Sequence, residues 1–205
     1  MFVYKKIKIV GVTGKSGSGK SSLCEILCLH KNVFLISADQ IAHEIILYDK
    51  NVYIGLVKTF GEKILNDNFS INRKKLSDLV FKSSENVKKI NLIMHEAIIS
   101  EIKIKIKNVS EENKNYDLIV IDAPLLIETG LNKICDEVWL VCAKKKLLDQ
   151  RLILRDNISQ DKINIRLKNQ IEFDEAKKFA DKIIYNDGSL IDLENKIKKI
   201  LGSEK

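Results

Sequence analysis

The fold of this chain is decided by residues 14–21, which read Gly-Lys-Ser-Gly-Ser-Gly-Lys-Ser. They follow an apolar, β-branched run at residues 7–12 and precede a helical pattern that runs from residue 20 to about residue 31. Glycine permits positive φ and a close approach of the backbone, so the N–H groups of such a loop can converge on an oxyanion. The helix that starts there adds the positive end of its dipole. The stretch therefore predicts a strand, a phosphate-binding loop and a helix in direct succession.

The loop matches the nucleotide-binding pattern G-x-x-x-x-G-K-[ST] without a mismatch. Four of the nine glycines of the chain fall within residues 11–19, and we assign all four to the phosphate cradle. In this chemistry Lys20 neutralises the β- and γ-phosphates and Ser21 ligates Mg²⁺ through its hydroxyl. ATP and Mg²⁺ are the expected co-substrate and metal. The nucleotide-binding residues predicted in this segment are Gly14, Gly17, Ser18, Gly19, Lys20, Ser21 and Ser22.

Four further apolar runs, at residues 33–36, 118–121, 138–141 and 182–185, alternate with helical patterns. Nearly continuous apolar runs are typical of strands that are buried on both faces of a parallel sheet. We therefore predict an α/β fold of the P-loop NTPase type, in which a central parallel sheet of five strands lies between two layers of helices. The mostly helical stretch between the second and third runs predicts an insertion, with a turn near residues 66–70.

The composition of the chain excludes several classes of protein. Its 205 residues, 45% hydrophobic and 31% charged, are typical of a folded domain. No apolar run approaches the roughly 18 residues that span a membrane, and residues 1–9 lack the pattern of a signal peptide. Four cysteines without a CxxC pair predict reduced core thiols, and we expect a cytoplasmic protein without a membrane partner. The lysines behind the net charge of +7 are scattered, so no nucleic-acid partner is expected.

Two carboxylates follow predicted strands at their carboxyl ends, where open α/β sheets bind ligands. Asp39 follows the second strand, and there it can accept the proton of an attacking hydroxyl; capping the next helix is an alternative or additional role. His43 lies one helical turn later on the same face. Asp122 ends the third strand, in the position of a carboxylate that orients Mg²⁺ or its waters, with a helix cap as the alternative.

Motifs along nearly the whole chain resemble the dephospho-CoA kinase family. They are the phosphate-binding loop with the Thr-Gly that opens it, A-D-x-I-A-H at residues 38–43, D-A-P-L-L-I-E at residues 122–128, and Ala-Asp at residues 180–181 with Asn-Asp-Gly at residues 186–188. The resemblance implies transfer of the γ-phosphate of ATP to the ribose 3′-hydroxyl of dephospho-CoA, the last step of coenzyme A synthesis. It also implies a core at about residues 6–48, 115–145 and 180–205, a helical acceptor-binding insertion at about 49–110, and a helical lid at about 146–172.

The resemblance assigns roles to single residues. It makes Asp39 the base, and it places Arg151 and Arg155 in the lid; with Lys20, these are the predicted catalytic residues. The predicted acceptor-binding residues are Asp39, His43, His95, Asp122 and Leu125. Asn186 joins the nucleotide-binding set, and Ser21 and Asp122 form the metal set. Ser37 and the pair Lys15-Ser16 depart from the family pattern, which usually has Asp and Gly-Ile at these positions.

The arginines fit this assignment. Only four of the 35 basic residues are arginines, and three of the four fall within residues 151–166. A planar guanidinium binds phosphate in a bidentate way that lysine cannot, although plain surface arginines are the alternative. For Arg166 we expect a weaker role in the lid, and an ion pair with an acidic residue of its own helix is the alternative.

Two other functions stay open at this stage. One is another P-loop small-molecule or nucleoside kinase. The other is a dimeric ATPase with a signature lysine, because Lys15 lies where that class has one, although Ser16 replaces a glycine of its pattern. A GTPase is disfavoured because no N-K-x-D element is in register. We expect a monomer, with a weak oligomer as the alternative.

Overall fold

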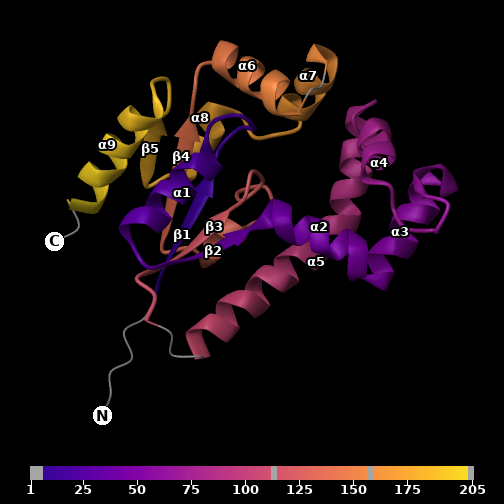
Figure 1. The fold of residues 1–205 in the computed structure, drawn as a ribbon, viewed down its shortest axis with the longest axis horizontal. Coiled ribbons are helices and arrows are strands. Elements are labelled where there is room, and N and C mark those ends of the chain that lie inside the picture. Colours follow the sequence, from indigo (N-terminus) through magenta and orange to yellow (C-terminus); the bar gives the residue numbers. More distant parts are fainter. Residues whose placement is uncertain (1–6, 112–114, 157–158, 203–205) are drawn as a thin grey trace.

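The computed structural model describes residues 7–111, 115–156 and 159–202. Five parallel strands form one sheet in the order β2-β3-β1-β4-β5 (Figure 1). Their bounds are β1 Lys8–Thr13, β2 Val33–Ser37, β3 Leu118–Asp122, β4 Glu137–Cys142 and β5 Lys182–Tyr185. The predicted strand positions and the parallel sheet are thereby confirmed. Residues 1–6 and 203–205, at the two ends of the predicted core, lie outside the described residues.

The register of the three central strands aligns the ends that carry the predicted site. Val12 of β1 and Ser37 of β2 both pair with Asp122 of β3. Every residue of β3 is buried, as its apolar run predicts for a strand covered on both faces. The phosphate-binding loop after β1, helix α2 after β2 and the turn after β3 therefore leave the sheet at one edge.

Helices cover both faces of the sheet, which confirms the predicted three layers. On one face α1 (Lys20–His30) and α9 (Leu190–Gly202) pack against the strands through a shared apolar core. On the other face α5 (Ser84–Glu111) and the turns before β4 contribute to a second core. The buried thiol of Cys24 fits the prediction for the cysteines, but Cys28 is exposed on α1, so its assignment to the core is wrong; all four thiols are free.

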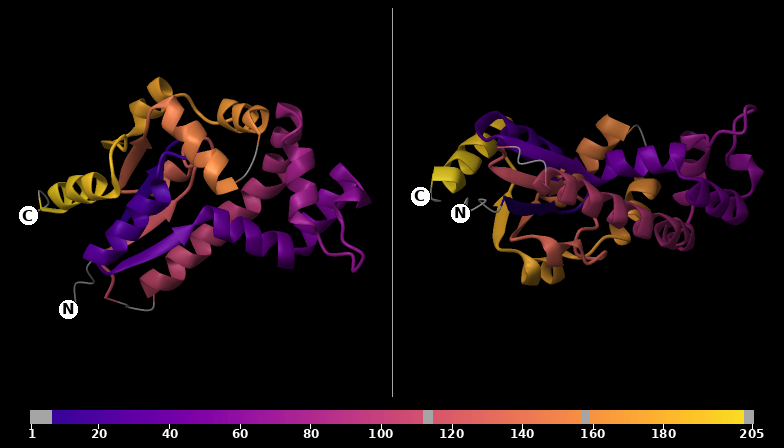
Figure 2. Two further views of the ribbon diagram at one scale, coloured as in Figure 1. Left: turned by 45° about the horizontal axis from the view of Figure 1, so that its top comes forward. Right: turned by 90° about the horizontal axis from the view of Figure 1, so that it is seen from below.

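The chain between β2 and β3 forms a helical body that extends away from the sheet (Figures 1 and 2). Its elements are α2 Ala38–Tyr48, α3 Lys50–Phe60, η1 Glu62–Ile64, α4 Arg73–Val80 and α5. The predicted turn is present, because Asn66 N–H donates to the Ser70 carbonyl at 2.9 Å. The fully buried Leu56, Ile64 and Ile102 join this body to the core of the sheet. The insertion therefore packs as a continuation of the domain.

The segment between β4 and β5 contains two helices above the sheet edge and a short connection back to the core. Its elements are α6 Lys145–Asp156, α7 Gln160–Lys168, α8 Phe173–Ala176 and η3 Lys177–Phe179. The buried Leu152, Ile163 and Leu167 form a small core between α6 and α7, separate from the two larger cores. Residues 157–158, inside the predicted lid, lie outside the described residues. Figure 1 shows α7 facing α4 across the top of the molecule.

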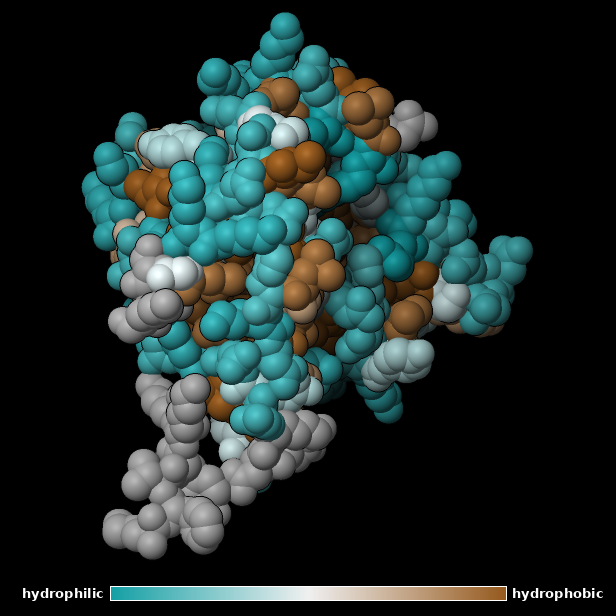
Figure 3. Space-filling model, turned by 60° about the vertical axis from the view of Figure 1, so that its left-hand side comes forward, coloured by the Kyte–Doolittle hydropathy of each residue, from teal (hydrophilic) through white to brown (hydrophobic). Residues whose placement is uncertain are grey.

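The surface agrees with the scattered charge of the sequence. Hydrophilic side chains cover most of the face drawn in Figure 3, and hydrophobic side chains show between them. No helix within the described ranges is both long and apolar enough to cross a membrane.

Candidate active site

Three glycines shape the loop between β1 and α1. Gly14, Gly17 and Gly19 have φ of 140°, 83° and 97°, a region that side chains disfavour. A Cβ on Gly14 would lie 2.0 Å from the Val141 carbonyl oxygen, and one on Gly19 would lie 2.0 Å from Asn186 Nδ2. The loop therefore needs glycine at these positions for both conformation and space.

The fourth glycine of the cluster has another role. Gly11 lies within β1, and a Cβ there would meet the side chains of Leu126 and Cys135 at 2.6 and 2.7 Å. It therefore allows the turn after β3 to pack closely on the sheet. Its assignment to the phosphate cradle is wrong, because spacing alone does not separate a strand glycine from a loop glycine.

Two side chains hold the loop from outside through its carbonyl groups. Arg151 of α6 donates to the carbonyls of Gly17, Ser18 and Asn186 at 3.3, 3.4 and 3.1 Å. Asn186, which is buried, donates through Nδ2 to the same Ser18 carbonyl at 2.8 Å. In a trans peptide the N–H points opposite to the C=O, so these contacts turn the Gly19 N–H away from Arg151. Arg151 and Asn186 thus fix the direction of the backbone dipoles in the loop.

Lys20 lies in the loop as a buried cation, only 6% exposed. Its Nζ donates to the carbonyls of Gly14 at 2.9 Å and Lys15 at 3.3 Å. Burial lowers the pKa of Lys20, and the carboxylates of Asp122 and Asp39 oppose that shift. The positive charge is therefore held close to both predicted carboxylates.

Asp122 and Ser21 meet at the start of α1. Ser21 Oγ donates to Asp122 Oδ2 at 3.1 Å, and Ser22 follows, partly buried, on the first turn. Burial raises the pKa of Asp122, while the charge of Lys20 and the hydroxyl of Ser21 counteract it. Turns rather than a helix follow Asp122, so the alternative of a helix cap is wrong.

The donor set at this point suits Mg²⁺. A hydroxyl and a carboxylate are hard oxygen ligands, and Mg²⁺ in nucleotide sites takes its other ligands from water and phosphate. Within the described residues no cluster of three or more His, Cys, Asp or Glu side chains could hold a metal without such help. The buried hydroxyls of Thr13 and Ser18 have no hydrogen-bond partner among the described residues, so this end of the sheet also holds unused polar groups. The residues therefore fit the metal and the phosphates that the motif predicts.

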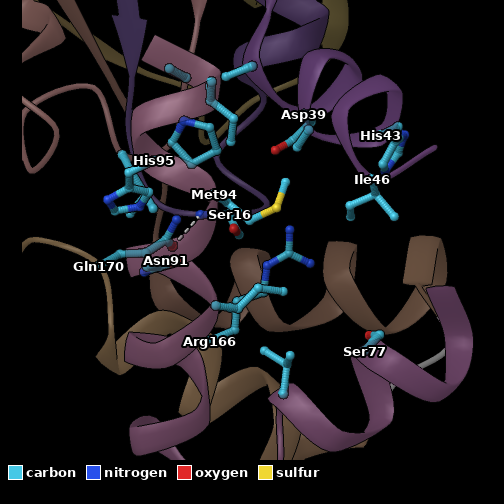
Figure 4. Close-up of a pocket in the computed structure, with 18 of the residues that line it drawn as sticks. Ser16, Asp39, His43, Ile46, Ser77, Asn91, Met94, His95, Arg166 and Gln170 are labelled. Carbon is cyan, nitrogen blue, oxygen red and sulfur yellow. Dashed lines mark hydrogen bonds between the residues drawn. The ribbon is translucent and has the colours of Figure 1, made fainter. Parts of the chain in front are cut away.

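Two cavities flank the loop. One, of about 850 Å³, lies over the loop and the ends of β4 and β5, between residues such as Ser18, Cys142 and Asp187. The other, of about 650 Å³, lies between the sheet edge and the helical body. Pro124 and Gln170 line both cavities. Gln170 Oε1 also accepts from the Ser16 N–H at 2.9 Å, drawn as a dashed line in Figure 4, so this side chain stands at the boundary between them.

Asp39 and His43 line the second cavity from α2, with Asp39 pointing into it (Figure 4). Ser37 is the N-cap of this helix, because its Oγ accepts from the Gln40 N–H at 3.3 Å. The alternative that Asp39 caps the helix is therefore wrong, and its exposed carboxylate stays directed to the cavity. The charge of this carboxylate counteracts the burial that lowers the pKa of Lys20 and adds to the burial that raises the pKa of Asp122, which places it on the side of the phosphate loop.

His95 and Leu125 line the same cavity. His95 Nε2 is buried and has no hydrogen-bond partner among the described residues. Burial lowers the pKa of His95. A buried ring nitrogen without a partner is costly, so it marks a point where a bound molecule could supply a hydrogen bond.

Three arginines line this cavity, and two of them share one acid. Arg155 donates from Nε and Nη2 to Asp156 at 2.6 and 2.9 Å, and Arg166 Nη1 contacts the same carboxylate at 2.8 Å. The partner of Arg166 is on α6 and not on its own helix α7, so the alternative of an intrahelical pair is wrong. The third arginine, Arg73 of α4, contacts His43 Nε2.

Sequence reasoning missed Arg73, Asp156 and Ser16 as residues of the site. The rarity of arginine was a usable signal for Arg73, since it is one of only four. No signal marked Asp156 or the Ser16 amide, because their roles depend on contacts between segments far apart in the chain.

Comparisons with known proteins agree over nearly the whole chain. The family model described as dephospho-CoA kinase matches residues 8–192. Dephospho-CoA kinases of Fusobacterium nucleatum and Aquifex aeolicus are 36% and 34% identical to the chain, over 94% and 95% of it and 96% of each relative.

Solved structures give the same result. The dephospho-CoA kinase of Campylobacter jejuni superposes with a TM-score of 0.66 at 29% identity, covering 95% of this chain and 96% of that one. A shikimate kinase from Acinetobacter baumannii, 16% identical over 98% of this chain and 97% of its own, shares the fold with a TM-score of 0.55. The matched family model and these similarities, together with the loop and the two cavities, show that the chain belongs to the dephospho-CoA kinase family.

Proposed function

We propose that this chain transfers the γ-phosphate of ATP to the 3′-hydroxyl of the dephospho-CoA ribose, the step that completes coenzyme A. One observation carries the proposal beyond family membership. The Asp39 carboxylate lies in the cavity next to the phosphate loop, and its negative charge influences the pKa values of both Lys20 and Asp122. A carboxylate so placed can meet an acceptor hydroxyl at the point where the γ-phosphate is delivered.

The cavity over the loop suits ATP. Backbone amides of residues 14–21 would bind the phosphates, and Lys20 would exchange its contacts with the loop carbonyls for phosphate oxygens. Ser21 and Asp122 would hold Mg²⁺, which when bound neutralises charge on the β- and γ-phosphates. Asn186 would hold the loop in place through its hydrogen bond to the Ser18 carbonyl.

The acceptor would enter the second cavity, between α2, α5 and the turn after β3. Asp39 accepts the proton of the 3′-hydroxyl as that oxygen attacks, and no covalent intermediate on the enzyme is needed. His95, with its unpartnered Nε2, and Leu125 would contact the same molecule. Catalysis then rests on positioning the two substrates and on neutralising charge.

The helices α6 and α7 are the lid in this proposal, with the insertion at about residues 49–110 as the acceptor-binding part and the rest as the core. Arg155, on the cavity side of α6, is our candidate for a direct phosphate contact. Arg151 acts on the phosphates through the loop carbonyls it holds. Helix α2 belongs to the predicted core at residues 6–48, and it contributes Asp39 and His43 to the acceptor cavity.

A panel of acceptors tests the proposal. Purified protein with Mg-ATP should phosphorylate dephospho-CoA far faster than nucleosides or shikimate. Preference for another acceptor would assign the chain to a different small-molecule kinase. ATP-dependent dimerisation without phosphorylation of any acceptor would favour the signature-lysine ATPase. Against that alternative, Lys15 Nζ forms an ion pair with Glu172 of its own chain at 2.7 Å.

Cytoplasmic location, a monomeric state and the absence of a nucleic-acid partner stay predictions.

A further inference from the structure

Arg73 differs from the other two arginines of the acceptor cavity in its neighbours. Arg155 and Arg166 both contact Asp156, so one carboxylate offsets one of their two positive charges. The Arg73 guanidinium hydrogen-bonds the His43 ring, and no carboxylate within the described ranges lies at ion-pair distance from it. Among the described residues, Arg73 is therefore the arginine of this cavity that has no ion-pair partner.

The contact with His43 fixes the protonation of the ring. A guanidinium can only donate hydrogen bonds, so Nε2 must accept, and the ring is neutral with its proton on Nδ1. Burial lowers the pKa of His43, the charge of Arg73 lowers it further, and Asp39 acts in the opposite direction. The pair thus carries one positive charge, and His43 orients the group that bears it.

The position of this charge relative to Asp39 suggests its ligand. His43 lies four residues after Asp39 on α2, so the two side chains are neighbours on one helix face. Arg73, which contacts His43, therefore lies on the side of the cavity from which Asp39 also acts on that ring. In dephospho-CoA, the ribose with the reacting 3′-hydroxyl carries a diphosphate on its 5′-carbon, so an anion must lie close to Asp39 when the acceptor is bound.

We propose that Arg73, oriented by His43, binds the diphosphate of the acceptor. A planar guanidinium can bind two phosphate oxygens at once, and an arginine without an acidic partner loses no ion pair in doing so. This inference rests on the proposed function, because it takes the acceptor to be a ribose 5′-diphosphate. It gives Arg73 a role in selecting the acceptor, while Asp39 acts on the reacting hydroxyl.

Steady-state kinetics of Arg73→Gln test the inference. The KM for dephospho-CoA should rise about tenfold or more, as expected for the loss of a hydrogen bond to a charged group, while kcat and the KM for ATP stay unchanged. Lys74→Gln is the matched control: it removes the same charge from the next residue of α4, which is exposed and does not line the cavity. Equal KM values for the two variants would overturn the inference.

The role of His43 needs a second comparison. His43→Phe keeps a ring but removes the acceptor nitrogen, so it should raise the KM for dephospho-CoA, and His43→Gln should restore part of the loss. Because His43 acts only through Arg73, His43→Phe should add little to the effect of Arg73→Gln. If the effects of the two substitutions on the KM were fully additive, His43 would not act by orienting Arg73.

Failure of this inference is distinguishable from failure of the proposed function. If the wild type does not phosphorylate dephospho-CoA, the proposed function is wrong. Calorimetric binding of dephospho-CoA to the wild type, Arg73→Gln and Lys74→Gln then still compares the two positions. Weaker binding by Arg73→Gln alone supports the anion contact, and equal binding by all three proteins contradicts it.

Discussion

At the scale of single residues, Asp39 is the side chain on which the chemistry depends most. Asp39→Asn keeps the size and polarity of the group but removes its ability to accept a proton. We expect kcat to fall by about 10²–10⁴, the range typical of a general base, while the affinity for ATP changes little because Asp39 does not line the cavity over the loop. Single-turnover kinetics and equilibrium ATP binding measure the two quantities. Full turnover by the variant would show that another group takes the proton.

Ser21 and Asp122 allow a test of the metal site that does not depend on transfer to the acceptor. Ser21→Ala removes the hydroxyl that donates a hydrogen bond to Asp122, and with it one of the two proposed protein ligands of Mg²⁺. Titration of ATP-saturated protein with Mg²⁺, followed by the change in melting temperature, should need a higher Mg²⁺ concentration in the variant. Cys28→Ala, at an exposed position further along α1, is the control and should titrate like the wild type.

The KM for dephospho-CoA should depend on pH, and the contact between His43 and Arg73 sets the direction of this dependence. The ring must be neutral to accept from Arg73, and burial together with the charge of Arg73 lowers its pKa below that of an ordinary histidine. Since the ring protonates only when the pH falls below this lowered pKa, the KM for dephospho-CoA should rise as the pH is lowered through that acidic range.

Other charged groups face the same cavity, so a control is needed. They are Asp39 on α2, Arg73 on α4, His95 on α5, Arg155 and Asp156 on α6, and Arg166 on α7. His95 also has a lowered pKa and could contribute to the profile. In His43→Gln the part of the acid limb that belongs to His43 should vanish, and an unchanged profile would assign the effect to another group.

At the scale of elements, α6 holds the phosphate loop through Arg151. Arg151→Met keeps most of the bulk but removes the three bonds to loop and Asn186 carbonyls. Hydrogen bonds of this kind contribute about 1 kcal/mol each, so the affinity for ATP should fall by about tenfold or more. Lys146→Met, an exposed change on the same helix, should leave ATP affinity intact. Isothermal titration calorimetry with ATP distinguishes the two.

Elements were more predictable than the contacts between them. The apolar runs predicted all five strands, since strands buried on both faces leave a local pattern. The residue that caps α2 was harder to predict, because Ser, Asp and Asn are all good caps, and only the structure shows that Ser37 takes this role. Ser37 thereby gains a function of its own, and the carboxylate of Asp39 stays directed to the cavity.

At the scale of the whole molecule, the sequence predicted which residues meet at the sheet edge but not how they are paired. The phosphate loop, Asp39 and Asp122 follow from the rule that ligands bind at the carboxyl ends of parallel strands. The sharing of Asp156 by two arginines joins α6 to α7, and the contact of Arg73 with His43 joins α4 to α2. Such contacts depend on tertiary packing and have no local signature.

Two cavities that share Pro124 and Gln170 give the molecule its proposed division of labour, with ATP on one side of the phosphate loop and the acceptor on the other. The central claim is direct transfer between them. The most direct test is to incubate the protein with Mg-ATP and dephospho-CoA, and to measure ADP and the phosphorylated product by ³¹P NMR. The account predicts one new phosphomonoester on the ribose 3′-oxygen for each ADP formed. Formation of ADP and free phosphate without the phosphomonoester would contradict it.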